Sequence, residues 1–476
     1  MLSFSRGVLP TSRHPAHNNG MASSQSSESG KRSTLSLASS IASSIRSGAL
    51  AFSDWILDWT PFGTIKVFYI FYMATNFYIA ATCVIESFLG LTPVRDARKA
   101  AMAVEATGKF PSDLNGTADN LPIIDLVIVA YLPNEQEIIR NQVLYACEEL
   151  LYPREKLRIN LVYNTPKAIE PLESELVLLP EQYKNLRVIK VPGSKSKADN
   201  LNYFFGLQSD AEIIGIFDSD HCPHPHNPRW AAERFLADQA VEIVQGRCIV
   251  YNTNERFYAR MIAVEFDKIY AISHPGRSRM FGFGLFCGSN GYWKAPLLRA
   301  HKMLGDMLTE DIDSALRAYG LGKKAVHDMN VTSFEMAPNT FKAFWNPPNG
   351  KRAVDKRCGI LSLLTIREIS YYLVTQHACL LLSFVIVDWP HSPAELGRLL
   401  FFRYPMAQWF FFATIVALLH TLYFTEKVRS EFTSFKDMVN FCIIYIPYLV
   451  LMATMGLYGH ARQIIKYSSW NPTVRK

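Results

Sequence analysis

The sequence predicts an α/β domain built on a mostly parallel sheet, joined to an α-helical transmembrane region. Two observations predict this class. Between residues 120 and 335, apolar strands alternate with helical patterns, as in sheets that carry helices on both faces. Outside this stretch, four uncharged runs approach or exceed the roughly 20 residues that a bilayer-spanning helix needs.

The composition of the 476-residue chain limits its classes of function. It has 49 basic and 42 acidic residues, a net charge of +7, and no long block of like charge. We therefore expect no nucleic acid as a partner; membrane lipid or an anionic substrate fits better. The eight cysteines include no C-x-x-C pair, which argues against a disulfide framework and a zinc ribbon and suits a reducing cytosol.

Residues 1–62 are predicted to be a tail outside the folded domains. Up to residue 50 the tail is rich in Ser and almost free of aromatic residues. It buries too little apolar area to offset its ordering entropy, so we expect disorder. It also lacks the compact apolar core of a signal peptide. AFSDWILDW (51–59) is a candidate interfacial segment, with its Trp rings at headgroup level.

The four uncharged runs are the candidate transmembrane helices. One lies in 63–91, where 19 uncharged residues separate Lys66 from Glu86. About three more lie in 368–461, in runs of 19, 22 and 24 residues. Buried core helices are the alternative, but Trp, Tyr, Lys and Arg flank the runs, as at membrane interfaces. A basic tail (462–476) follows.

Six short runs between the first and second spans are predicted strands. The first, IIDLVIVAY, is apolar apart from Asp125, as expected of a parallel strand covered on both faces. A helix is expected from about Asn134. The six predicted strands are 123–131, 158–164, 186–191, 212–218, 241–246 and 323–328.

Polar residues end three of these strands. They are Tyr131 to Glu135 after the first strand, Asn164 at the end of the second, and Asp218 with Asp220 at the end of the fourth. Ligands bind at the carboxyl ends of strands in such sheets. We therefore expect these groups to converge on one ligand.

Asp218-Ser219-Asp220 places two carboxylates two positions apart, where strand side chains point the same way. One or two carboxylates, completed by phosphate and water, usually hold Mg²⁺ or Mn²⁺. The motif thus predicts a metal–diphosphate site, with an acidic turn as the alternative. Three histidines and Cys222 follow closely, so zinc is a further alternative, although no second ligand pair occurs elsewhere.

The stretch GSKSKADNLN (193–202) is a candidate phosphate-binding loop. Its glycine and serine can expose backbone N–H groups, and Lys195 and Lys197 add positive charge. The helix that begins there directs its N-terminal dipole at the ligand. A solvated basic loop before an ordinary amphipathic helix is the alternative.

The stretch LTEDIDSALRAYG (308–320) is predicted to be a helix with Thr309 as its N-cap and Glu310 and Asp311 in its first turn. A carboxylate kept ionised by a helix N-terminus at the mouth of a pocket can act as a general base. Favourable interaction with the helix dipole explains the same acids without catalysis.

The stretch FCGSNGYWK (286–294) has small residues between aromatic side chains, and we expect a flexible loop there. Gly288, Ser289 and Gly291 would let the backbone approach a ligand closely. Loop flexibility alone is the alternative explanation.

The order of these motifs resembles the family 2 glycosyltransferases, specifically the membrane-embedded cellulose, chitin and hyaluronan synthases. The motifs are A-Y-x-x-N-E, K-A-x-N-x-N, D-S-D, F-C-G-S-N and T-E-D, followed by candidate spans. The resemblance implies a GT-A fold, which is Rossmann-like, a UDP-sugar donor, Mg²⁺ or Mn²⁺, and inversion at the anomeric carbon. It implies a growing polysaccharide as acceptor, exported through the spans. Addition of one sugar to a lipid-linked acceptor is the alternative.

The resemblance also implies roles for individual residues. Asp311, with Glu310 beside it, is the expected catalytic base, and Asp218 and Asp220 are the expected metal ligands. Residues expected to bind the donor are Tyr131, Asn134, Glu135, Asn164, Lys197, Asp218 and Asp220. Residues expected to bind the acceptor are Phe286, Cys287, Gly288, Ser289 and Trp345.

Two positions depart from the family pattern. Asn164 stands where an Asp is usual; its amide still offers a donor and an acceptor for uracil. In the predicted interfacial segment 336–367, the expected Q-x-x-R-W motif is replaced by AFWNPPNGKRAVDKRCG, where Pro347 and Pro348 would break a helix. Either Trp345 and nearby basic residues substitute, or the chain is a non-catalytic homologue.

UDP-sugars are cytosolic. The resemblance therefore implies a multi-pass integral membrane protein, expected in the plasma membrane, whose catalytic domain faces the cytosol.

Overall fold

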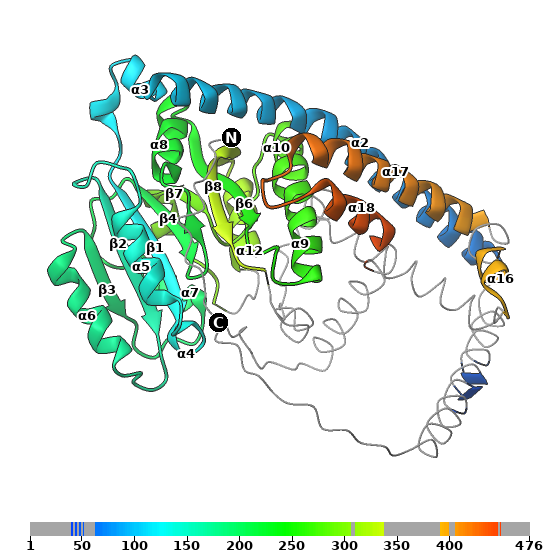
Figure 1. Cartoon of the computed structure of the whole chain (residues 1–476), viewed down its shortest axis with the longest axis horizontal. Coiled ribbons are helices and arrows are strands. Elements are labelled where there is room, and N and C mark those ends of the chain that lie inside the picture. The colour runs from blue at the N-terminus through cyan, green and yellow to red at the C-terminus, as the bar shows by residue number, and fades with distance from the viewer. Residues whose placement is uncertain are drawn as a thin grey trace. The chain divides into compact units, whose positions relative to one another are not determined.

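The computed structural model describes residues 62–305, 310–337, 391–398, 405–445 and 448, together with residues 40, 43, 44, 47, 48 and 51 (Figure 1). The chain divides into two compact units. One consists mainly of Ala81–Ile369 and Ala417–Lys476, and the other of Ser3–Ala80 and Ser370–Val416. The sheet and all described candidate site residues belong to the first unit.

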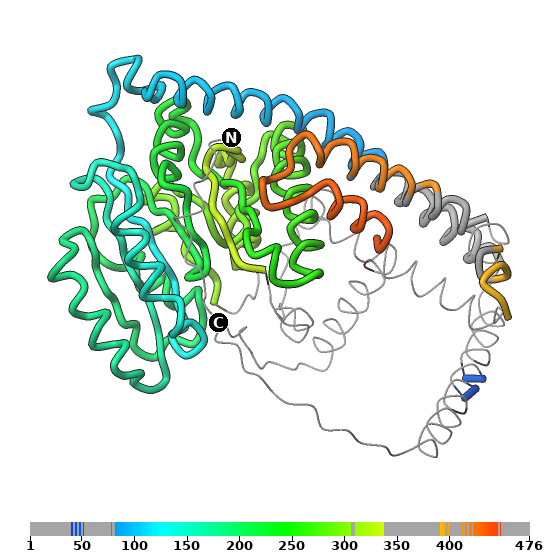
Figure 2. Tube along the Cα trace, in the orientation of Figure 1, coloured from blue at the N-terminus to red at the C-terminus, as the bar shows by residue number. Residues whose placement is uncertain are grey.

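The sheet has eight strands in the order β3-β2-β1-β4-β7-β6-β8-β5, and its course can be followed in Figure 2. Its strands are β1 (Ile124–Tyr131), β2 (Leu157–Asn164), β3 (Leu186–Lys190), β4 (Ile213–Asp218), β5 (Cys222–Pro223), β6 (Val241–Val250), β7 (Gly291–Lys294) and β8 (Lys324–Glu335). All six predicted strands are present, so the mixed α/β class is confirmed.

Helices cover both faces of this sheet. The helices that precede β8 in the chain are α2 (Phe62–Thr107), α3 (Pro111–Leu114), α4 (Leu132–Glu135), α5 (Ile139–Glu148), α6 (Leu172–Gln182), α7 (Lys197–Phe205), α8 (Asn227–Ala237), α9 (Phe257–Lys268), α10 (His274–Phe281), α11 (Ala295–His301) and α12 (Glu310–Gly320). Two short turns are also helical: η1 (Ala118–Asn120), and η2 (Ile269–Ser273), which is a π-helical turn. The later helices are α16 (Pro393–Arg398), α17 (Pro405–Val428) and α18 (Phe435–Ile443).

Two apolar clusters, one on each face, hold these layers together. One joins the sheet to α5, α6 and α8, through side chains such as Val143 and Trp230. The other joins the sheet to α7, α11 and α12, through side chains such as Leu201, Leu298 and Ala315. Burial on both faces explains why β1, apart from the buried Asp125, and β4, apart from its last residue Asp218, are apolar in sequence.

The parallel strands β2, β1 and β4 end at one edge. Val129 of β1 lies opposite Asp218 of β4, and Tyr131 of β1 lies opposite Asn164 of β2. The polar strand ends predicted to converge are therefore neighbours.

The sheet is less parallel than predicted. The short strand β7 runs antiparallel to both β4 and β6, and β5 pairs antiparallel with β8. Residues 291–294, predicted to be part of a flexible loop, instead form a buried strand. Gly215 in β4 makes room for it, because a Cβ there would lie 2.7 Å from the Tyr292 ring.

Among the described residues, no helix combines the length and the apolar character needed to cross a membrane. The first predicted span lies within α2 and the third within α17, while α18 covers only the start of the fourth. The second, like residues 338–367 and 462–476, lies outside the described residues. The transmembrane region therefore stays a prediction.

Candidate active site

Lys197 joins two of the predicted motifs. It is the first residue of α7, whose N-cap residue Ser196 accepts a hydrogen bond from the Asp199 amide. Its ammonium lies 2.5 Å from Oδ1 of Asp218, at the end of β4, and donates to the Gly288 carbonyl at 2.7 Å. The basic loop, the D-S-D strand end and the F-C-G-S-N loop thus meet at one side chain.

The same loop contacts Asp311. Gly288 has a φ of +90°, and a Cβ there would lie 2.7 Å from Oδ2 of Asp311. Ser289 accepts a hydrogen bond from the Asp218 amide at 3.1 Å. Asp218, which lies about ninety positions before Asp311 in the chain, is therefore connected to it through Gly288 and Ser289.

Electrostatics link these groups. Burial raises the pKa of Asp311. It also raises the pKa of Glu310, to about 7. The positive charge of Lys197 opposes both shifts. Burial alone would lower the pKa of Lys197, but the carboxylates of Asp218, Glu310 and Asp311 outweigh it, so this pKa lies above its usual value. Carboxyl groups with raised pKa values are suited to accept protons near neutral pH.

Asp220 is suited to hold a metal together with Asp218. Asp220 is buried, and ligand atoms of Asp218, Asp220 and His221 all lie within 4.8 Å of one another. The imidazole of His221 is already engaged, because Nε2 lies 2.8 Å from the Glu335 carboxylate and Nδ1 lies 3.2 Å from Oγ of Ser333. The two carboxylates would thus supply oxygen ligands of the kind that fits Mg²⁺ or Mn²⁺.

The zinc alternative loses support here. Cys222 donates to the side chain of Gln142, away from the histidines. Burial alone would lower the pKa of His221, but Glu335 raises it well above its usual value, and a protonated imidazole does not ligate zinc. The described residues contain one other group with metal-ligand spacing, His221, Cys248 and Glu335, and it includes the same histidine.

The predicted donor residues at the ends of β1 and β2 lie at this edge. Glu135 accepts a hydrogen bond from the Tyr131 amide at 2.9 Å, which fixes the short helix α4 that includes Asn134. The Asn164 amide accepts from Asn200 at 2.9 Å and donates to the Ser194 carbonyl at 3.1 Å. Asn164 thus positions the Lys197 loop, and its contact with a base stays a prediction.

The predicted acceptor residues are placed differently from one another. Gly288 and Ser289 lie beside the acids, as described above. Phe286 is buried in the core, with its ring edge-to-face against Trp293. Cys287 is half-buried, and its Sγ lies 3.8 Å from Nδ1 of His274. Trp345, like Thr309, lies outside the described residues.

Two buried amides that the sequence did not indicate hold the 287–290 loop. Gln245 of β6 donates to the Ser289 carbonyl at 3.0 Å and accepts from the Cys287 amide at 2.9 Å. Asn290, with a φ of 53°, donates to the carbonyls of Arg247 and Val331, both at 3.0 Å. The sequence reveals neither set of contacts, because the partners of Gln245 and Asn290 lie more than 40 positions away.

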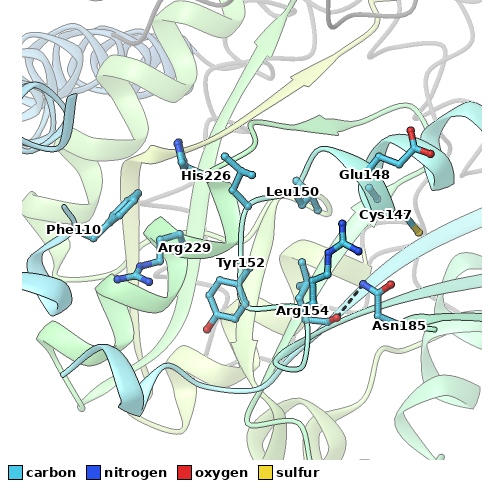
Figure 3. Close-up of a pocket in the computed structure, with 12 residues that line it drawn as sticks. Phe110, Cys147, Glu148, Leu150, Tyr152, Arg154, Asn185, His226 and Arg229 are labelled. Atoms are coloured by element: carbon cyan, nitrogen blue, oxygen red, sulfur yellow. Dashed lines mark hydrogen bonds between the residues drawn. The ribbon is translucent and has the colours of Figure 1, made fainter. Parts of the chain in front are cut away.

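A cavity of about 350 Å³ lies apart from these residues (Figure 3). It is lined by Phe110, Tyr152, Arg154 and His226, near the start of β2 rather than its end. None of the predicted site residues lines it.

Comparison with protein families identifies the chain. The model of "Glycosyl transferase family group 2" matches residues 213–457, just over half of the chain. The chain belongs to this family. The match begins at β4 and includes the D-S-D, F-C-G-S-N and T-E-D motifs.

Individual relatives in this family are distant. A probable glycosyltransferase, YdaM, of Bacillus subtilis is 26% identical over 230 residues, 47% of this chain and 53% of the relative. Glucomannan 4-beta-mannosyltransferase 1 of Oryza sativa is 25% identical over 229 residues, 46% of this chain and 43% of the relative. The chain thus spans about half the length of the curated relatives that it matches.

Among solved structures, the chain is similar to the mannosyltransferase PcManGT of Pyrobaculum calidifontis in complex with GDP-Man and Mn²⁺. The TM-score is 0.40 and the identity 14%, over 80% of this chain and 100% of the other.

Proposed function

We propose that this protein is an inverting, metal-dependent glycosyltransferase that moves a sugar from a nucleoside diphosphate sugar to a growing polysaccharide. The observation that carries the proposal is the position of Lys197, which binds Asp218 and the Gly288 carbonyl at once. Asp311 lies against the same glycine. The ammonium of Lys197, the carboxylates of Asp218 and Asp220, and the candidate base Asp311 are therefore within reach of one donor molecule.

The donor's diphosphate fits beside the N-terminus of α7. The Lys197 ammonium would interact with the negative charge that develops on the departing nucleotide, as preorganised cations do in other transferases. Asp218 and Asp220 would hold Mg²⁺ or Mn²⁺ at the diphosphate, and this ion would supply further charge neutralisation there. The Tyr131–Glu135 segment and Asn164 border the same edge and would contact the nucleoside.

Asp311 would act as the base. It would remove the proton from the acceptor hydroxyl as that oxygen forms a bond to the anomeric carbon. The bond between this carbon and the diphosphate oxygen breaks, and the nucleotide leaves with the electron pair. A single displacement needs one base and inverts the anomeric carbon. Glu310 lies beside Asp311, and both side chains are half-buried.

The chemistry of the donor has two candidates. The motif resemblance favours a UDP-sugar. The glucomannan mannosyltransferases among the relatives, together with the GDP-Man complex named above, make GDP-mannose the second donor to test. A membrane location, with the domain facing the cytosol and the product exported through the spans, is also part of the proposal. It rests on the four uncharged runs in the sequence.

Nucleotide release by membranes that contain the full chain tests the proposal. UDP-glucose, UDP-N-acetylglucosamine, UDP-glucuronate and GDP-mannose are supplied separately with Mn²⁺ or Mg²⁺, and Asp311→Asn serves as the inactive control. We expect one donor to release nucleotide at a rate that Asp311→Asn lowers at least about 100-fold. Polymer size on a gel then separates polysaccharide synthesis from addition of one sugar to a lipid. Release from no donor would contradict the proposal, and so would an equal rate in the variant.

A further inference from the structure

His327 is a buried histidine without hydrogen-bond partners. It lies on β8 opposite Gln245 of β6, and its side chain is 9% exposed. Neither Nδ1 nor Nε2 has a hydrogen-bond partner among the described residues. Burial, and secondarily the positive charge of Arg247, lowers its pKa to about 3. The ring is therefore neutral and presents one N–H donor and one acceptor nitrogen.

This arrangement is unfavourable unless something pairs with the ring. A buried polar atom left without a partner costs about 1–3 kcal/mol. Most buried polar side chains in folded proteins do have a partner, and an exception calls for a functional or structural explanation. No metal explains this one, because neither described group with metal-ligand spacing contains His327.

The neighbours of His327 connect it to the catalytic loop. Its ring packs edge-to-face on His274, with centroids 5.7 Å apart, and the His274 ring packs on Tyr270 at 5.0 Å. His274 in turn lies 3.8 Å from Sγ of Cys287. Cys287 directly precedes Gly288, whose α-carbon borders Asp311. The cluster of Tyr270, His274 and His327 thus adjoins the loop that contacts the base.

The backbone around this cluster is also unusual. Tyr270 lies within the π-helical turn η2, and His274 follows that turn directly. Single π-helical turns inside helices are rare and occur frequently at functional sites. This turn brings both aromatic rings onto the side of the helix that faces His327 and Cys287.

We infer that His327 binds a hydroxyl group of the acceptor carbohydrate and that Tyr270 and His274 form the aromatic wall of this subsite. A neutral imidazole suits a neutral hydroxyl, which can both donate and accept. Aromatic walls with a few polar groups are typical of ligand sites. The inference rests on the proposed function, because it names the acceptor side of the same reaction.

Binding of neutral oligosaccharides to the full-length protein tests this subsite without turnover. The probes are mannotetraose and cellotetraose, followed by saturation-transfer NMR in the absence of donor. We expect the wild type to bind at least one probe and His327→Phe to bind it roughly fivefold to tenfold more weakly, as the loss of one hydrogen bond predicts. His327→Gln, which keeps a donor and an acceptor, should retain most of the affinity.

His226→Phe is the matched control, because it makes the same exchange at a histidine that lines the separate cavity of Figure 3. It should bind the probe as the wild type does. His327→Phe should also melt no lower than the wild type, because it removes two unpaired polar atoms, so loss of folding will not mimic loss of binding. With an active donor, the acceptor KM of His327→Phe should rise above that of the wild type and of His327→Gln.

The outcomes separate the inference from the proposed function. Equal probe binding by wild type and His327→Phe would overturn the subsite, as would a wild type that binds neither probe. A binding difference in a protein that releases nucleotide from no donor would support the subsite and contradict the proposed reaction.

Discussion

Replacement of Gly288 by alanine tests whether the position of Asp311 matters for turnover. The new Cβ would lie 2.7 Å from Oδ2 of Asp311, whereas ordinary contacts begin at about 3.4 Å. The carboxylate would therefore have to recede by about 0.7 Å, the difference between these distances. The carbonyl of the same residue accepts from Lys197, so the loop has little freedom to move instead.

The expected effect has two parts. A non-glycine residue at a φ of +90° destabilises the fold by about 1–2 kcal/mol. Displacement of a reacting group by close to 1 Å lowers the rate by up to about 100-fold. We therefore expect Gly288→Ala to lower kcat between roughly 10-fold and 100-fold while the nucleotide still binds.

Gly116→Ala separates the two parts. Gly116 also has a positive φ, of +67°, but a Cβ there would meet nothing within 4 Å. It should lose similar stability by chemical denaturation and keep its rate of nucleotide release. If Gly288→Ala releases nucleotide as fast as Gly116→Ala, Asp311 is not the group whose position limits the reaction.

Three further predictions concern the metal, the pH dependence of stability and a buried ion pair. Asp220→Ala should abolish the Mn²⁺ dependence of nucleotide binding in a titration with and without the metal; unchanged dependence would exclude Asp220 as a ligand. The folded-state pKa of Glu310, about 7, lies above the ordinary value of 4.5. Its contribution to stability is therefore present below pH 4.5 and lost as the pH rises through 7, so Glu310→Gln should flatten the unfolding free energy across this window in urea titrations. The guanidinium of Arg247 lies 2.7 Å from the buried carboxylate of Asp267. Arg247→Met leaves this carboxylate without its cation and should therefore destabilise the protein by about 3–5 kcal/mol in the same assay. A loss below about 1 kcal/mol would show that this pair adds little to stability.

The strands β1, β2 and β4 were predictable because each is a mainly apolar run that ends in a polar residue. β1, β2 and β4 begin and end within one residue of the predicted positions. The strands β5 and β7 have two and four residues, too few for a periodic pattern to appear. β7 also lies in a glycine-containing stretch, and only its pairing with β4 and β6 makes it a strand.

The proximity of the charged side chains was predictable for a different reason. Lys197, Asp218 and Asp311 each stand at the end of a strand or the start of a helix, and topology brings such ends together. The motif predicts Phe286 on the acceptor side. In the structure its apolar ring is buried against Trp293, where it is out of contact with water. Gln245 carried no signal, because a polar residue within an apolar strand does not reveal which distant carbonyls it will bind.

A structure of the full chain with Mn²⁺ and the nucleoside diphosphate of the active donor is the most direct test of the account. The account predicts the ion between the carboxylates of Asp218 and Asp220, and the diphosphate beside the ammonium of Lys197. A nucleotide bound elsewhere, for example in the cavity that Phe110 and Tyr152 line, would contradict it.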